Sequence, residues 1–220
     1  NPNSPVSACH QVAERLLLAK GDAMGDLFRR ADTVRRTFMG DEVFIRGIIE
    51  YSNICSRNCD YCGIRASNRK VRRYSMSADE VLESARGLPA AGITTVVLQS
   101  GESPAFGDRE LGELIRRIKS ETPLAVTVSA GARPKEIYRL WRDCGMDRYL
   151  IRFETSDPAL YAKLHPDSTL AERLDCIRAL QDLGVQAGSG FMIGVPGETV
   201  GILAENILLC RRLDLDMIGI

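Results

Sequence analysis

Two hydrophobic patterns divide the chain near residue 42. In residues 1–42, apolar side chains such as Phe28, Val34 and Phe38 recur among charged ones at helical spacing. From residue 43 onward, short apolar runs alternate with longer helical stretches. The pattern predicts an N-terminal helical segment (residues 1–42) followed by an α/β unit (residues 43–220).

The second part alternates strands and helices along its whole length. The predicted strands are 43–50, 94–98, 124–129, 148–153, 186–193 and 217–220. The predicted helices are 78–90, 108–120, 134–144, 170–183 and 199–211. Ser77 and Glu80 form a capping box at the start of the first of these helices, and Pro134 suits a first helical turn.

Such alternation predicts a parallel sheet with right-handed crossovers, either open or closed into a barrel. No glycine-rich dinucleotide fingerprint follows the first strand, which weakens a Rossmann interpretation. Because the sequence stops on an apolar strand, we expect further barrel units to follow in the complete protein.

Composition narrows the range of partners. The 220 residues are 45% hydrophobic and carry 29 basic and 29 acidic side chains, so the net charge is zero. This balance gives no sign of a nucleic-acid-binding or anionic-membrane surface. The start lacks a secretory signal, and no apolar run reaches the roughly 20 residues that span a bilayer. We therefore expect a cytoplasmic protein with seven reduced cysteines.

Three of these cysteines, Cys55, Cys59 and Cys62, form a C-x3-C-x2-C run directly after the first predicted strand. Four thiolates would close a zinc site or complete the usual ligand set of a cubane iron–sulfur cluster. Three thiolates leave one metal position open, where a small molecule can bind. The missing ligand therefore indicates a functional metal centre.

Other candidate residues lie at the carboxyl ends of the predicted strands, where functional groups gather in parallel α/β folds. Gln99, Ser100, Gly101 and Glu102 follow the second strand, and without the cysteines they would be more typical of an ordinary turn than of a ligand site. Thr127 and Ser129 lie at the end of the third strand. Their hydroxyls either line a cavity or form hydrogen bonds with backbone groups of the barrel.

The fourth strand carries Arg152 and Glu154 on one face. They form either an internal ion pair or a site for a zwitterion, in which the guanidinium binds a carboxylate and Glu154 binds an ammonium. Arg173, taken alone, is typical of a solvated helix charge, and Met192 of a core residue. His10 and His165 have no metal-type neighbours in the sequence, and no side chain is assigned as a catalytic acid, base or nucleophile.

The cysteine run, with Tyr61 before its last cysteine, resembles the signature of radical S-adenosylmethionine (SAM) enzymes. The resemblance implies a 4Fe–4S cluster held by Cys55, Cys59 and Cys62, with SAM chelated at the fourth iron. It implies further cofactor contacts and a substrate cavity. The cofactor contacts would be Ser100, Gly101, Glu102, Ser129, Glu154, Arg173 and Met192. The cavity residues would be Gln99, Thr127 and Arg152. Residues 99–102 resemble the family's Gly-Gly-Glu segment but begin with Gln-Ser.

Within the biotin-synthase-like branch, residues 46–55, 97–102, 147–155 and 216–220 resemble the HydE family of FeFe-hydrogenase maturases. This implies a TIM-type (β/α)8 barrel, of which about six βα units are present. It also implies an oxygen-sensitive enzyme that cleaves SAM to a 5′-deoxyadenosyl radical during assembly of the hydrogenase di-iron site.

The implied partners are a small iron- and cysteine-derived precursor, an electron donor such as ferredoxin or flavodoxin, and other maturation proteins. The alternatives are a methylornithine-synthase-like or biotin-synthase-like enzyme acting on an amino-acid-type substrate, an iron–sulfur carrier, and a structural metal module.

Overall fold

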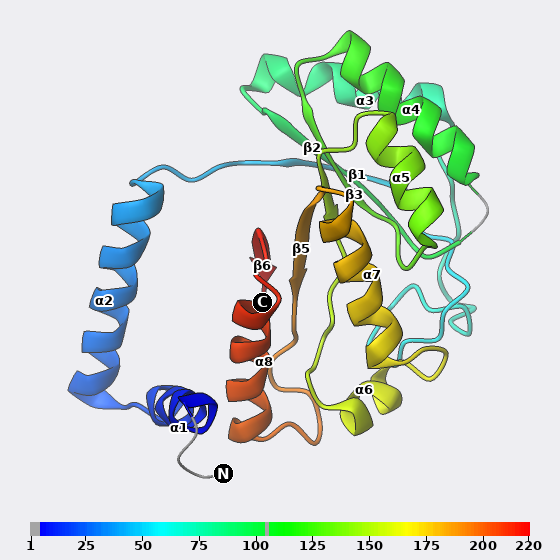
Figure 1. The fold of residues 1–220 in the computed structure, drawn as a ribbon. Helices are drawn as coiled ribbons and strands as arrows, with labels where there is room; N and C mark the ends of the chain where they lie inside the picture. The colour runs from blue at the N-terminus through cyan, green and yellow to red at the C-terminus, as the bar shows by residue number, and fades with distance from the viewer. Residues whose placement is uncertain (1–4, 104–105) are drawn as a thin grey trace.

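The computed structural model describes residues 5–103 and 106–220. Its centre is a six-stranded parallel sheet in which each strand pairs with the next one along the chain (Figure 1). The strands are β1 (Gly47–Ser52), β2 (Thr95–Ser100), β3 (Ala125–Ser129), β4 (Arg148–Leu150), β5 (Gln186–Gly190) and β6 (Met217–Gly219). This sequential order is that of a barrel and differs from a doubly wound sheet, whose strand order reverses. The predicted parallel α/β architecture is confirmed.

Helices connect and cover these strands. They are α3 (Ala78–Gly87), α4 (Asp108–Glu121), α5 (Lys135–Asp143), α6 (Pro158–Leu164), α7 (Leu170–Asp182) and α8 (Val200–Arg212), with a 3-10 turn, η1 (Pro89–Ala91), after α3. The predicted capping box is present, because the Ser77 hydroxyl accepts from the Glu80 amide and the Glu80 carboxylate accepts from the Ser77 amide. The sequence pattern therefore located five of these helices to within a few residues.

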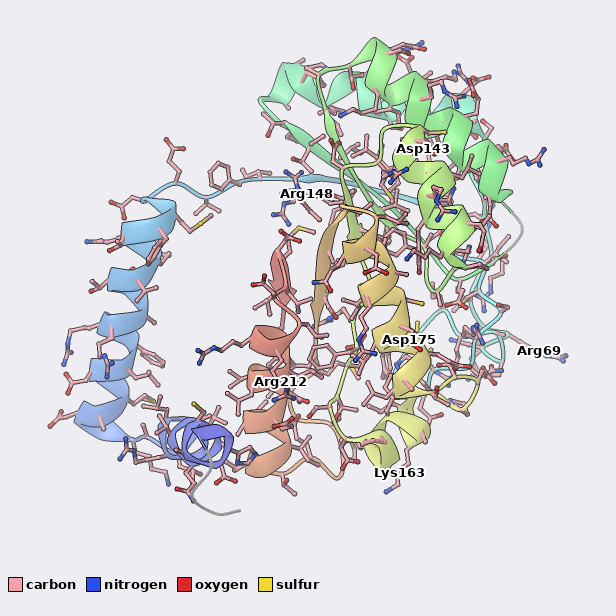
Figure 2. All side chains as sticks on the ribbon, in the orientation of Figure 1. Arg69, Asp143, Arg148, Lys163, Asp175 and Arg212 are labelled. Carbon is pink, nitrogen blue, oxygen red and sulfur yellow. The ribbon has the colours of Figure 1, made fainter. Side chains whose placement is uncertain are left out.

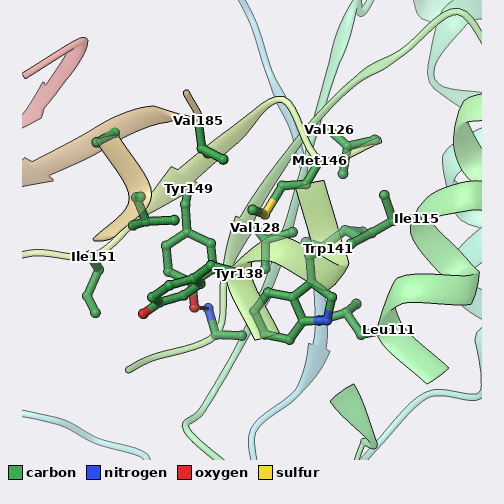
Figure 3. Packing of buried hydrophobic residues seen from close by; sticks show 14 of the residues in the cluster. Leu111, Ile115, Val126, Val128, Tyr138, Trp141, Met146, Tyr149, Ile151 and Val185 are labelled. Carbon is green, nitrogen blue, oxygen red and sulfur yellow. Dashed lines mark hydrogen bonds between the residues drawn. The ribbon is translucent and has the colours of Figure 1, made fainter. Parts of the chain in front are cut away.

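Three buried aromatic rings join strand β4 of the sheet to helix α5. Tyr149 of β4 lies 4.9 Å from Tyr138 and 6.0 Å from Trp141, both on α5, measured between ring centroids (Figure 3). The Tyr149 hydroxyl donates to the Gly131 carbonyl, and the Arg133 amide donates to the Tyr138 hydroxyl. Each ring pair contributes about 0.5–1.5 kcal/mol beyond its area burial. The cluster also fixes the loop that follows β3, which borders the site described below.

The structure differs from the sequence prediction around β4. The predicted strand 148–153 ends at Leu150, although the Ile151 and Glu154 amides still donate to Gly188 and Gly190 of β5. Glu154 has φ 63°, in the left-handed region, so the backbone leaves the regular strand there. Helix α6 was not predicted, although Asp157 caps it and Pro158 begins it, which are ordinary helix-start signals.

The N-terminal segment consists of α1 (Pro5–Leu17) and α2 (Gly21–Met39), as its pattern predicts. Helix α1 packs on α8, where His10 Nε2 lies 3.1 Å from the Gly201 carbonyl oxygen. Helix α2 stands apart from the sheet (Figure 1) and exposes Phe28 and Phe38. The domain boundary at residues 42 and 43 stays a prediction. None of the helices in the described ranges is both long and apolar enough to cross a membrane.

Candidate functional site

The cysteine run forms an irregular loop after β1 that neighbouring segments hold in place. The Ser56 amide donates to the Glu102 carbonyl, the Asp60 amide to the Leu164 carbonyl, and the Asn58 amide to the Asp167 carboxylate. All seven cysteines are free thiols. Burial, together with the neighbouring thiols of Cys55 and Cys62, raises the pKa of Cys59 to about 11. The thiols of Cys55 and Cys62 therefore lie near Cys59, and the loop that carries all three is anchored at several points.

Gly101 permits the close approach of β2 to this loop. A methyl group added at Gly101 would lie 2.7 Å from Cys55 Cβ and would also collide with the Ile54 carbonyl oxygen. The Gly101 amide donates to the Ser52 carbonyl at the end of β1. The role of Gly101 is thus to seat the first cysteine against the sheet, and its predicted cofactor contact stays a prediction.

Arg73 holds the far side of the loop. Its guanidinium donates to four backbone carbonyls, those of Asn53, Ile64, Arg65 and Asn68. The sequence did not identify this residue as important. Arg73 lies among several other basic residues, and nothing in the local sequence distinguishes the one that binds these carbonyls. The clamp ties both ends of the cysteine loop to one rigid, planar group.

A cavity of about 450 Å³ opens at the carboxyl ends of the strands, beside the cysteine loop. It brings together residues from β1 through α7 that lie far apart in the sequence. Those predicted as site residues are Gln99, Ser100, Ser129, Arg152, Glu154, Arg173 and Cys62. Tyr61, Tyr74 and His165 also line it and were not predicted as site residues. The strand-end argument therefore located five residues of the cavity lining, namely Gln99, Ser100, Ser129, Arg152 and Glu154.

Thr127 and Met192 are among the predicted residues that do not line this cavity. Thr127 is buried in β3, and its hydroxyl has no hydrogen-bond partner among the described residues. Met192 follows β5, where its amide donates to the Glu154 carbonyl, and it is not among the cavity-lining residues. Their contacts with cofactor or substrate stay predictions.

Arg152 and Glu154 both face this cavity. Arg152 Nε lies 3.7 Å from Glu154 Oε2, and Arg152 Nη2 donates to the carbonyls of Phe191 and Gly219. Burial raises the pKa of Glu154, although the charge of Arg152 and the Tyr61 hydroxyl oppose the shift. Arg152 and Glu154 therefore form the internal ion pair that was one of the two expectations. Both residues also line the cavity, and their binding of a zwitterion stays a prediction.

Glu102 lies behind the cysteine loop. Its Oε1 accepts from Arg57 Nε at 2.5 Å, and its Oε2 accepts from the Ala132 amide at 2.9 Å. It lines a separate depression of about 280 Å³ together with Arg57, Arg133 and Arg173. The predicted contact between Glu102 and SAM stays a prediction. In this structure both carboxylate oxygens already have protein partners.

Arg173 lines both the cavity and the depression, and its Nε donates to the Tyr161 hydroxyl at 3.1 Å. Burial works against its charge, but the hydroxyls of Tyr161 and Tyr61 and the Glu102 carboxylate outweigh that effect, so its pKa is raised. Arg173 is therefore a cation of the site, whereas its sequence position alone was typical of a solvated helix charge.

His165 was assigned no role from the sequence, and the structure places it against the cysteine loop. Its Nδ1 lies 3.2 Å from Cys59 Sγ, and its Nε2 lies 3.1 Å from the Tyr61 hydroxyl. Burial, with the charges of Arg173 and Arg57, lowers the pKa of His165 to about 4, so the ring is neutral near pH 7. The histidine and the cysteine are 106 residues apart, which is why no local motif joined them.

Comparison with known proteins agrees with this geometry. The Radical SAM superfamily model matches residues 49–209, which include the cysteine loop, the cavity and five of the six strands. This chain belongs to the radical SAM superfamily.

Relatives within this superfamily agree with the branch expected from the sequence. The chain is 44% identical over 194 residues to the [FeFe] hydrogenase maturase subunit HydE of Thermotoga maritima, a match that covers 88% of this chain and 56% of the maturase. It is 32% identical to a biotin synthase of Magnetococcus marinus, over 92% of this chain and 64% of the synthase. The chain thus spans somewhat more than half the length of these relatives.

The radical SAM fold is also shown by a solved structure. A crystal structure of methylornithine synthase superposes with a TM-score of 0.87 at 25% identity, covering 95% of this chain and 61% of that protein. The TIM-barrel-like architecture predicted from the alternation of strands and helices is therefore confirmed.

Radical SAM proteins use a 4Fe–4S cluster and SAM, and the residues here fit both groups. Within residues 5–103 and 106–220, no three His, Cys, Asp or Glu side chains are grouped closely enough to hold a single ion. Cys55, Cys59 and Cys62 are free thiols on one anchored loop, and each would bind a different iron of such a cluster. Arg152 Nε and Glu154 Oε2 are buried without hydrogen-bond partners in the described structure, as expected of groups that await a polar ligand. The cavity volume lies in the range of small-molecule sites.

Proposed function

We propose that this chain is the cluster-binding and SAM-binding part of an enzyme that acts in assembly of the di-iron site of FeFe-hydrogenase. The observation that carries the proposal is the 44% identity to HydE across 88% of the chain, which includes the whole cysteine loop and cavity. The activity, substrate and partners of the complete protein belong to this proposal, because the chain spans 56% of that relative.

The proposal gives each part of the site a task. When bound, the cluster supplies the electron that cleaves SAM to methionine and a 5′-deoxyadenosyl radical. Cys55, Cys59 and Cys62 hold the cluster, and Glu154 and Arg173 bind polar groups of SAM with the hydroxyls of Ser100 and Ser129. The protein's contribution is to orient the cofactor and exclude water from the barrel interior.

The cysteine assignment is tested by anaerobic reconstitution of the full-length protein with iron and sulfide. Cys59→Ala should abolish both the brown 4Fe–4S absorbance and the formation of 5′-deoxyadenosine after reduction. Cys9→Ala, at an exposed thiol on α1, is the matched control and should retain both. A Cys59→Ala protein that keeps the 4Fe–4S spectrum would contradict the ligand assignment. A wild-type protein that binds the cluster but leaves SAM intact would instead be an iron–sulfur carrier.

A methylornithine-synthase-like activity is the second candidate. It is supported by 26% identity to the 3-methylornithine synthase of Methanosarcina acetivorans, and by a cavity that presents Arg152 and Glu154 to an amino-acid-type substrate. Complementation of a hydrogenase-maturation mutant by the full-length protein supports the maturase proposal. Formation of 3-methylornithine, without complementation, supports the second candidate.

The electron donor in this proposal is a small acidic redox protein such as ferredoxin or flavodoxin. Residues 57–73, which contain two of the cluster cysteines, carry six Arg or Lys side chains against one Asp in a chain of zero net charge. Arg69, Lys70 and Arg72 are exposed, and Arg69 projects outward from the molecule (Figure 2). A local positive field of this kind favours encounter with an acidic partner. The free thiols and the cluster's oxygen sensitivity suit the cytoplasm, where we place the protein.

A further inference from the structure

A chain of polar contacts runs from the cysteine loop into the cavity. Cys59 Sγ lies 3.2 Å from His165 Nδ1, His165 Nε2 lies 3.1 Å from the Tyr61 hydroxyl, and that hydroxyl lies 3.2 Å from Glu154 Oε1. Three positively charged side chains lie close to these residues: Arg173 and Arg57 near His165, and Arg152 beside Glu154. None of these contacts is local in the sequence, since each joins residues 93 to 106 positions apart.

The His165 ring is held rigidly. It is 4% exposed, stacks on Tyr161 with a centroid distance of 4.5 Å and an interplanar angle of 16°, and meets the edge of Tyr61 at 5.4 Å and 75°. The ring directly follows α6, whose Asp157 cap and Pro158 start fix its position. Its two nitrogens therefore point at defined partners, one toward the cysteine sulfur and one toward the tyrosine.

The direction of the first hydrogen bond follows from the chemistry of the sulfur. A thiolate that binds iron has no hydrogen to donate, so it can only accept. His165 Nδ1 must then carry the hydrogen, whether the ring is neutral or charged. Hydrogen bonds to the sulfurs are among the factors that set the reduction potential of an iron–sulfur cluster. A donor stabilises the reduced form more, because the added electron increases the negative charge on the sulfur.

We propose that His165 is a positioning residue that donates a hydrogen bond from Nδ1 to the cluster-bound sulfur of Cys59 and raises the reduction potential of the cluster. The inference rests on the cluster assignment made under the proposed function. It assigns the tuning of the cluster to a side chain that also lines the cavity.

Tyr61 extends this arrangement toward the cavity. It has one hydroxyl hydrogen and two acceptors within reach, His165 Nε2 and Glu154 Oε1. When Nδ1 carries the hydrogen of the neutral ring, Nε2 is an acceptor, and Tyr61 donates to it. Glu154 Oε1 is then left to accept from a ligand in the cavity. Binding of the cluster at Cys59 is thereby linked, through His165 and Tyr61, to whether Glu154 is free to accept a hydrogen bond from a ligand.

The test is the midpoint reduction potential of the 4Fe–4S cluster in the full-length protein without SAM, measured by a redox titration followed by electron paramagnetic resonance. His165→Phe should shift the potential to a more negative value, and His165→Asn, whose amide can donate from near the Nδ1 position, should restore much of the shift. Tyr61→Phe should give a smaller shift in the same direction. His10→Phe, at the histidine bound to Gly201, should leave the potential unchanged.

The outcomes separate this inference from the assignment on which it rests. A fully loaded His165→Phe protein with the wild-type potential would overturn the hydrogen bond alone, whereas a wild-type protein without any 4Fe–4S signal would overturn the cluster assignment. If His165→Phe does not load, wild-type protein with 15N-labelled histidine decides the question. A weak nitrogen coupling to the reduced cluster supports the hydrogen bond. Neither the absence of coupling nor a coupling as large as that of a direct iron ligand is compatible with it.

Discussion

Arg152 Nε lies 3.7 Å from Glu154 Oε2, and neither atom has a hydrogen-bond partner in the described parts of the chain. A purely structural ion pair would be expected to satisfy these atoms, since a buried charge without hydrogen bonds is costly. Glu154 also adopts φ 63°, a conformation that costs a non-glycine residue of order 1 kcal/mol or more. Backbone strain and an unpaired carboxylate oxygen at Glu154 are together typical of a binding site, where the ligand supplies the missing contact.

Glu154→Gln should weaken SAM binding to the cluster-loaded protein. The substitution keeps the shape of the side chain and removes its charge, so a charge-assisted hydrogen bond worth about 1.5–3 kcal/mol is lost. The expected result is a roughly 10- to 100-fold increase in the Kd for SAM, measured by isothermal titration calorimetry. Glu136→Gln, at an exposed position on α5, is the control. Equal Kd values for the wild type and Glu154→Gln would remove Glu154 from the cofactor site.

The stability of the cluster-free protein should depend on pH through Glu154. Its pKa in the folded protein is raised by burial above the ordinary value of 4.5, so the folded state holds this proton more tightly than the unfolded state does. Stability from this group therefore falls as pH rises from 4.5 through the raised pKa. The free energy of unfolding of the wild type, minus that of Glu154→Gln, should become more negative over this interval. Denaturant titrations at a series of pH values measure it, and a pH-independent difference would contradict the assigned burial effect.

Gly101→Ala should displace the cysteine loop. The added methyl group would meet Cys55 Cβ at 2.7 Å and the Ile54 carbonyl, and overpacking of this kind costs about 1–3 kcal/mol. We expect reduced unfolding stability and less bound iron and sulfide after reconstitution. Gly63→Ala is a matched control in the same loop, because a methyl group there would meet nothing within 4 Å. Full cluster occupancy in Gly101→Ala would show that the loop tolerates the displacement.

Replacement of Arg69, Lys70 and Arg72 by glutamine should slow cluster reduction by an acidic donor such as flavodoxin. Rim charges act mainly on the association rate, so the wild-type rate should fall as salt increases and the variant should lose most of this dependence. Stopped-flow kinetics at several ionic strengths measure both effects. The control replaces three exposed cations elsewhere, Lys20, Arg30 and Arg211. If both triple variants respond alike, the basic loop does not guide the donor.

Local chemistry in the sequence was enough to predict the order of the six strands and five of the helices that connect them. Periodicity distinguishes strands from helices, and Ser77 with Glu80 marks a helix start, because these signals depend on residues within a few positions of each other. The cysteine spacing is local in the same way. Strand ends could then be searched for polar groups, and Ser100, Ser129, Arg152 and Glu154 were found there because parallel strands place their carboxyl ends at one edge.

What only the tertiary structure decided is which side chains meet across the barrel. Sequence spacing carries no information about contacts between residues 57 and 102 or between residues 59 and 165, since loops and an unpredicted helix bring them together. For the same reason Glu102 has Arg57 as its partner here, and His165 lies against Cys59 although no motif contains both residues. The sequence by itself therefore determined the parallel α/β fold and the cysteine motif on which the cluster assignment rests. Packing determined the electrostatic environment of the cluster, because that depends on distances between segments that are remote along the chain.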